Sequence, residues 1–228
     1  MKTLTWKPIF RNLEETYVEL KHLHCRLFYL AFGELPDDVA GDGACKAGLA
    51  KSERRDPFTE RGLYVSLDHA FHHLNWAWNV RRTPEDRVWH FTEKEFNRWS
   101  KFPKTREFAA LWPSEKSNRR GPGKLGDRKV SLTPVRVSIQ MAWRKLGILC
   151  ARIAKGIGED SSWHPCPDGE GDAVAQPLTE REFALRMHRI YAKLNYAWNS
   201  RHDKSFVVGP HAILRRRCFS PMFMGNQP

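Results

Sequence analysis

Histidines are the residues of this chain whose spacing comes nearest to a metal site. His69 and His73 stand four residues apart, so in a helix they lie on one face, where two ligands can bind the same ion. No glutamate lies between them in an HExxH arrangement, and no CxxC pair occurs in the chain. We therefore expect no bound metal and no cofactor, with His69 and His73 as weak candidate ligands.

Other catalytic signatures are missing from the sequence. The stretch Gly121 to Gly126 lacks the Gly-Lys-Ser/Thr ending of a phosphate-binding loop, and no Gly-x-Ser-x-Gly nucleophile motif occurs. Catalytic groups also converge from distant positions, so an enzyme is not excluded. No catalytic residue is indicated, and the pattern favours a protein without catalytic activity.

A repeated motif of asparagine, tryptophan and arginine is a second candidate site. It reads Leu-Asn-Trp-Ala-Trp-Asn-x-Arg at 74–81 and Leu-Asn-Tyr-Ala-Trp-Asn-x-Arg at 194–201. One interpretation is structural, with asparagines that cap and connect helices, since buried polar groups usually serve structure. The other is a ligand groove about a pseudo-dyad. Its candidate lining residues are Asn75, Asn79, Arg81, Asn195, Asn199 and Arg201.

The charge pattern indicates an acidic partner. The chain has 38 Lys and Arg against 26 Asp and Glu, a net charge of +12. Residues 128–158 contain basic residues and no acidic one, and several follow a four-residue step along one predicted helix face. Such a face could neutralise phosphates, although charge runs are more often ordinary solvated surface. The candidate nucleic-acid-binding residues are Arg119, Arg120, Lys124, Arg136, Arg144, Lys145, Arg152 and Lys155.

The motif belongs to a longer internal repeat. Residues 57–82 align without gaps with residues 177–202, at an offset of about 120 residues, and ten of the 26 positions are identical. Apolar residues recur at three- and four-residue spacing in both copies, which predicts amphipathic helices. Thr59 and Thr179 stand where N-caps belong, and Glu182 completes a capping box with Thr179.

A second helix is predicted upstream in each copy. One runs from Leu13 to Phe32, after an Asn12 cap and before Gly33; the other runs from Pro134 to Lys155, between Thr133 and Gly156. Short helices are expected from Thr92 and over 105–112. The predicted fold is all-α: two diverged helical-hairpin repeats packed as a helical bundle, with extra short helices after the first repeat.

The repeats divide the chain into three parts. Residues 1–112 hold the first repeat and the short helices, 113–131 form a basic Gly/Pro/Ser linker, and 132–228 hold the second repeat and a basic tail. Alternatively, both repeats form one pseudo-symmetric domain. Long polar loops over 34–58 and 157–178 separate the paired helices, and loops of this length are typical of functional or disordered segments.

Composition limits the class of protein. The chain has 228 residues, is 41% hydrophobic and contains nine Trp, which supports a packed core and argues against wholesale disorder. No stretch approaches the roughly 20 apolar residues of a membrane span, and no secretory signal opens the sequence. Five cysteines without such a signal indicate free thiols, so we expect a cytoplasmic protein.

Three functions remain open. The leading hypothesis is a non-catalytic binding protein with a basic face that engages the nucleic-acid backbone. The alternative is a protein–protein interaction module, an adaptor or inhibitor that docks on an acidic partner protein. The third is an enzyme that uses the His cluster or the repeated Asn/Arg groove. Four tryptophans fit either base stacking or the core: Trp76, Trp89, Trp99 and Trp112.

Overall fold

Helices account for nearly all of the regular structure. The computed structural model describes residues 4–36, 58–103, 128–159 and 178–202. Across these residues, β-type pairing is confined to one isolated bridge between Thr59 and Lys129. The long helices are α1 (Trp6–Phe32), α3 (Glu60–Asn79), α6 (Leu132–Ile157) and α7 (Glu180–Asn199), and the short ones are α4 (Glu85–Trp89) and α5 (Glu93–Trp99). The all-α class predicted from the sequence is confirmed.

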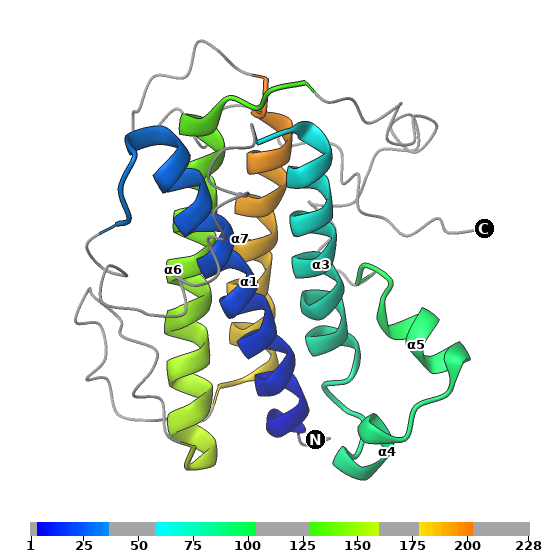
Figure 1. Cartoon of the computed structure of the whole chain (residues 1–228). Coiled ribbons are helices and arrows are strands. Elements are labelled where there is room, and N and C mark those ends of the chain that lie inside the picture. The colour runs from blue at the N-terminus through cyan, green and yellow to red at the C-terminus, as the bar shows by residue number, and fades with distance from the viewer. Residues whose placement is uncertain (1–3, 37–57, 104–127, 160–177, 203–228) are drawn as a thin grey trace.

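The four long helices pack as a bundle with antiparallel neighbours (Figure 1). Both α1 and α7 pack against α3 and α6, so α3 and α6 lie diagonally opposite each other. The backbone N–H of Thr5, just before α1, donates to the carbonyl of Arg81, just after α3, at 2.9 Å. Ser131 and Arg201 make the same contact for α6 and α7 at 2.7 Å. The chain therefore runs up, down, down and up, as two hairpins joined by a diagonal connection.

None of the described helices is long and apolar enough to cross a membrane. Each instead has one apolar face, and these faces meet in the bundle. Buried apolar residues of all four long helices form one continuous cluster. Between α3 and α7, the rings of Phe71 and Tyr191 stack with centroids 5.6 Å apart, and the Tyr191 hydroxyl donates to Asn75 Oδ1 at 2.7 Å. Between α1 and α6, Tyr17 packs on Trp143 at 5.7 Å.

Several of the predicted caps are confirmed. The Thr59 side chain accepts the backbone N–H of Gly62 at 3.2 Å, and Thr179 with Glu182 forms the complete capping box. Gly33 ends α1 with a φ of 80°, a left-handed conformation that glycine adopts without steric cost. These ends are set by local backbone chemistry, which is why the sequence reveals them.

The predicted start of α1 is wrong. The helix begins at Trp6 rather than Leu13, and Asn12 lies inside it, where its amide donates to the Pro8 carbonyl at 2.9 Å. Proline is tolerated in a first turn because the nitrogen there has no intrahelical partner. Trp6 packs edge-on against Phe183 with centroids 5.6 Å apart, so tertiary packing extends the helix past a good local cap.

The predicted limits of α6 are also shifted. The helix begins at Leu132, so Thr133 lies within it instead of capping it. It continues past Gly156 to Ile157 and ends at Gly158, whose φ is 72°. Two glycines are available for the stop, and the later one takes the left-handed conformation. The short helix expected over 105–112 falls outside the described residues.

Two glutamates, Glu60 and Glu180, join the hairpins through ion pairs at opposite ends of α3 and α7. Arg81 Nε donates to Glu180 at 2.8 Å, and Arg201 Nε donates to Glu60 at 2.7 Å. Burial raises the pKa of both carboxyls, but the hydrogen bonds and charges of the basic partners outweigh it, so the net pKa of each is lowered. Both glutamates therefore remain ionised at neutral pH.

Replacing these glutamates is expected to destabilise the protein unequally. The Glu60 side chain is 10% exposed and that of Glu180 is 31% exposed. Because an ion pair contributes more where its carboxylate is less accessible to water, Glu60→Ala should lower the free energy of unfolding by about 2 kcal/mol and Glu180→Ala by about half as much. Urea denaturation followed by circular dichroism measures both. An equal or reversed order would contradict this role of burial.

Candidate nucleic-acid interface

The predicted basic row on α6 is half-buried along most of its length. Arg136, Arg144, Lys145 and Arg152 all have intermediate exposure, and Lys155 alone in this row is exposed. The three other candidates, Arg119, Arg120 and Lys124, lie outside the described residues. The regular spacing therefore places the cations on one helix, but it does not make them an open surface.

Two cations of this row contact other helices. The Arg136 guanidinium lies over the rings of Phe28 and Phe32 on α1, 5.4 and 5.0 Å from their centroids, and burial lowers its pKa. Arg152 lies 3.5 Å from the Glu182 carboxylate of α7. These side chains contribute to packing between helices. Part of the chain's positive charge is therefore in contact with other helices and less accessible to a ligand.

Three exposed aromatic side chains lie together on and around α4 and α5. The side chains of Trp89, Phe91 and Phe96 are 53%, 44% and 38% exposed. We call these three residues the aromatic patch. Beneath it, Trp76 and Trp99 are buried, with centroids 5.1 Å apart, and form a small second core with Val80 and Val88. Of the four tryptophans considered for base stacking, Trp89 is therefore the exposed one among the described residues, and Trp112 lies outside them.

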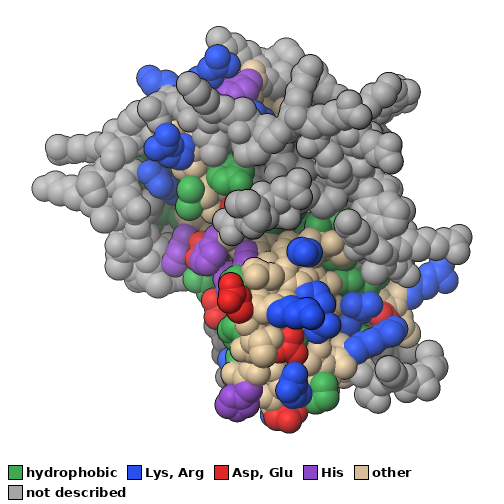
Figure 2. Space-filling model, turned by 90° about the vertical axis from the view of Figure 1, so that its right-hand side faces the viewer, with side chains coloured by type: hydrophobic (Ala, Val, Ile, Leu, Met, Phe, Trp, Pro, Cys, Tyr) green, Lys and Arg blue, Asp and Glu red, His purple; other side chains and the backbone are tan. Residues whose placement is uncertain are grey.

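Charged side chains surround the aromatic patch. Figure 2 shows this face, on which Lys and Arg side chains are interspersed with acidic ones. Arg87 is paired with Glu95 at 2.9 Å, and Arg98 lies 5.9 Å from the ring centroid of Trp99. The exposed basic residues on α4, α5 and the start of α1 are Lys7, Arg11, Arg87, Lys94, Arg98 and Lys101. The exposed acidic ones on α4 and α5 are Glu85, Asp86 and Glu93.

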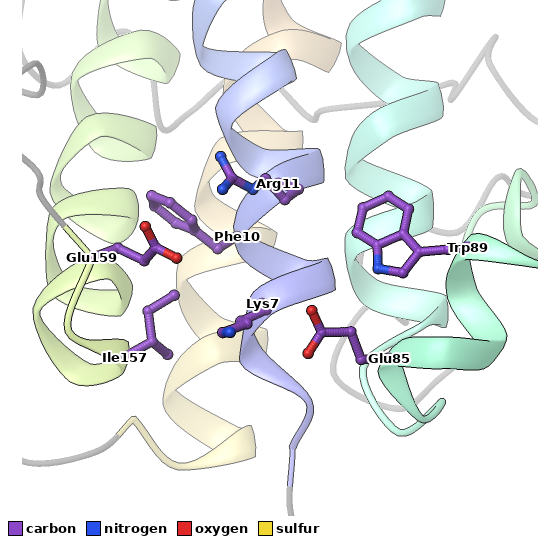
Figure 3. A pocket seen from close by; sticks show the side chains of 7 residues that line it. All are labelled: Lys7, Phe10, Arg11, Glu85, Trp89, Ile157 and Glu159. Atoms are coloured by element: carbon purple, nitrogen blue, oxygen red, sulfur yellow. The ribbon is translucent and has the colours of Figure 1, made fainter.

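A small pocket adjoins Trp89, with a volume of about 110 Å³ (Figure 3). Its lining comes from the start of α1, from α4 and from the end of α6. Lys7 and Arg11 contribute positive charge, and Glu85 and Glu159 contribute negative charge. Because the carboxylates offset the cations, the pocket alone is not an anion site. It does bring the end of α6 next to an exposed ring of the aromatic patch.

The asparagines of the first motif copy hold α5 against α3. The Asn75 amide donates to the Ser100 carbonyl at 2.7 Å. The Asn79 amide donates to the carbonyls of Trp99 and Lys101 at 2.8 and 2.7 Å. The indole N–H of Trp76 donates to Ser100 Oγ at 3.1 Å. These asparagines therefore connect helices, as the structural interpretation of the motif expects.

The arginines of the motif lie far from one another. Arg81 and Arg201 pair with glutamates at opposite ends of the seam between α3 and α7. At 1.5 Å per residue, helices of 20 residues separate these ends by about 30 Å. Asn195 is 5% exposed and Asn199 is exposed on α7. The six candidate groove residues thus line the length of the seam rather than a single ligand-sized site.

The histidines of α3 face carboxylates of α1. His69 Nδ1 lies 3.1 Å from Glu19, and His73 Nε2 lies 3.7 Å from Glu15. Burial, together with the smaller effect of the neighbouring His69 and His72, lowers the pKa of His73 to about 4, so the distant Glu15 does not keep it charged at neutral pH. Over the described ranges, no three His, Cys, Asp or Glu residues are close enough to bind a metal together.

Another histidine is fully buried in the bundle. The His24 ring stacks on Trp143 with centroids 5.3 Å apart, and neither ring nitrogen has a hydrogen-bond partner. Burial, together with the smaller effect of the charges of Arg136 and Arg144, lowers the pKa of His24 to about 4. At neutral pH this residue is an uncharged ring that serves packing.

The sequence did not single out Phe91 and Phe96 as members of a surface. They stand outside the repeat and in helices too short to show periodicity. One available signal was the capping box Thr92–Glu95, which is present in the structure and fixes where α5 begins. The aromatic patch emerges only once α5 is docked on α3.

Compared with protein-family models, curated proteins and solved structures, the chain matches none of them. The candidate interface therefore rests on the geometry of this chain.

The buried His24 should make stability fall in mild acid. Its pKa is about 4 in the folded protein and about 6.5 when the chain is unfolded, so the unfolded state binds the proton between these values. The contribution of His24 to the free energy of unfolding is fully present above pH 6.5. It is lost as the pH falls toward 4, by up to about 3 kcal/mol. In denaturant titrations at pH values from 7 to 4.5, the free energy of unfolding should fall less for His24→Phe than for the original protein. Parallel curves would contradict the assignment.

Removing the Asn79 amide should release α5. Asn79→Ala eliminates two hydrogen bonds to the end of α5, each worth about 1 kcal/mol. We expect amide hydrogen exchange over residues 93–101 to accelerate by about tenfold or more, while α1 and α6 keep their protection. The matched change Asn199→Ala on α7 should leave exchange over 93–101 unaltered. Uniform acceleration along the chain would instead indicate global destabilisation.

Proposed function

We propose that the protein binds nucleic acid without catalysing a reaction, and that the aromatic patch is the centre of its interface. The observation that carries the proposal is the exposure of Trp89, Phe91 and Phe96 beside exposed Lys and Arg side chains. Large exposed rings are costly in water and are typical of binding surfaces. Rings interleaved with cations are a common way to bind single strands, because bases stack on the rings while cations contact phosphates.

The surrounding charge sets the kind of recognition. Lys94, Arg98 and Lys101 are exposed on or just after α5, and Lys7 and Arg11 are exposed at the start of α1. Contacts of this kind neutralise the backbone and release counterions, so affinity should depend strongly on salt. They carry little information about base sequence. We therefore propose binding that favours unpaired strands over particular sequences.

We infer that the bundle arose by duplication of one helical hairpin. The 120-residue offset relates Arg81 to Arg201 and Glu60 to Glu180, and each arginine pairs with the glutamate of the other hairpin. Two related units packed about a two-fold axis make reciprocal contacts of this kind. The shared residues are scaffold in this account, and α4 and α5, which follow the first hairpin, supply the binding surface. A cytoplasmic location fits this proposal.

A second candidate is supported by the residue types of the same surface. Trp89, Arg87 and Arg98 are exposed there, and Trp and Arg are enriched in protein–protein hot spots. In this alternative the aromatic patch docks on an acidic partner protein. Both candidates use the same side chains, so the ligand that binds them distinguishes the two.

Binding of a fluorescent single-stranded oligonucleotide, measured by anisotropy at increasing salt, tests the proposal. Trp89→Ala should weaken binding by about tenfold or more, since stacking on one ring is worth about 1–3 kcal/mol. The double change Lys94→Glu and Arg98→Glu should weaken binding and reduce the slope of log affinity against log salt by about two. Duplex DNA should compete poorly with the labelled single strand for the protein.

Two control variants locate the interface. Leu185→Ala removes an exposed apolar side chain from α7, far along the chain from the aromatic patch, and should bind normally. Lys155→Glu near the end of α6 should have a smaller effect than the α5 changes. Absence of binding at low salt, or normal binding by Trp89→Ala, would remove nucleic acid as the ligand. Pull-down of an acidic protein by the original chain, but not by Trp89→Ala, would then support the alternative.

A further inference from the structure

The small pocket adjoins the aromatic patch, because Trp89 belongs to both. Its volume is about 110 Å³, whereas sites that enclose a whole drug-sized ligand have about 300–1,000 Å³. The pocket therefore suits one protruding group of a larger ligand that lies outside it. On a single strand held at the aromatic patch, the group that can turn out of the stack is a base.

The pocket has an apolar part on which a ring can lie. The Trp89 side chain is 53% exposed, so part of its ring is open to a ligand. Phe10 of α1 and Ile157 of α6 add apolar atoms to the lining. Every base can stack on an aromatic ring, so this part of the pocket favours a base without selecting which one.

Charged side chains of both signs form the rest of the lining. In Figure 3, Lys7 and Arg11 extend from α1, and the Glu85 and Glu159 carboxylates lie on either side of that helix. Two cations and two carboxylates leave the lining without net charge. Such a lining favours an uncharged group that carries both hydrogen-bond donors and acceptors at its edge, as a base does.

Glu85 is the group that can distinguish between the bases. It stands four residues before Trp89 in α4, so both side chains lie on one face of that helix. A carboxylate has two acceptor oxygens and no donor. Guanine presents two adjacent N–H donors, at N1 and at its 2-amino group, and so matches both oxygens. Adenine and cytosine place a lone pair beside their amino group, and in thymine and uracil a single N–H stands between two carbonyls.

We propose that the pocket binds one unpaired guanine base, which lies on Trp89 and donates from N1 and its 2-amino group to the Glu85 carboxylate. Lys7 donates to O6 and N7, the acceptors that cations contact on guanine in duplex grooves. The contact is assigned to Lys7 because Arg11 already pairs with Glu14 at 2.9 Å. This inference rests on the proposed function, since the base belongs to a strand held at the aromatic patch. Backbone contacts leave the base sequence open, and the pocket adds a preference at one position.

Fluorescence anisotropy with labelled oligothymidine tests this inference. One strand carries a single dG at its centre, and another carries deoxyinosine there, which keeps N1–H and O6 but lacks the 2-amino group. We expect the dG strand to bind about tenfold more tightly than plain oligothymidine, and the deoxyinosine strand to lose most of this gain. Glu85→Gln should abolish the preference for dG, because an amide offers one acceptor beside a donor.

Asp86→Asn is the matched control, because it removes the same charge from the next residue, which is not part of the pocket lining. This variant should keep the preference for dG. If plain oligothymidine binds and dG adds no affinity, the guanine pocket alone is overturned. It is also overturned if Glu85→Gln weakens every strand alike, or if Asp86→Asn removes the preference. If no strand binds at low salt, the proposed function fails and the guanine pocket with it.

Discussion

The guanidinium groups that follow α3 and α7 form the interactions on which the rest of the bundle depends. Arg201 lies 3.8 Å from the ring centroid of Trp198, donates to the Trp198 carbonyl at 2.8 Å and pairs with Glu60 on the other hairpin. Arg81 makes the equivalent contacts with Trp78 at 4.0 and 2.9 Å. One planar side chain thus donates to a carbonyl at a helix end, covers a core tryptophan and joins two hairpins. A lysine could not replace all three contacts.

This arrangement separates the scaffold from the candidate binding surface. The arginines, glutamates, tryptophans and capping threonines common to both hairpins are engaged in ion pairs, in the core and in caps. The first hairpin differs in what it carries on its outer side. There, Asn75 and Asn79 fix α5, and the fixed α5 in turn exposes Phe96 beside Trp89 and Phe91. The aromatic patch therefore depends on scaffold asparagines that do not contact the proposed ligand.

Local chemistry explains how far the sequence predicts this structure. The caps at Thr59 and Thr179 and the stop at Gly33 depend on residues within a few positions, and all three were predicted. The start of α1 was not, because the packing of Trp6 on Phe183, a residue more than 170 positions away, outweighs the cap at Asn12. Likewise, spacing placed the α6 cations on one face but gave no information on what packs beside them.

The same distinction applies to charge. A net charge of +12 suggests an extended basic surface, but a cation affects a partner only where it is exposed and unpaired. Arg136 is half-buried over aromatic rings, Arg152 lies near Glu182, and Arg81 and Arg201 are paired with glutamates. The exposed Lys and Arg side chains that a ligand can reach therefore lie away from the seams between helices. Because several cations of α4 and α5 are exposed while most of the α6 row is half-buried, the α4 and α5 cations are better placed to meet the phosphates of the proposed ligand.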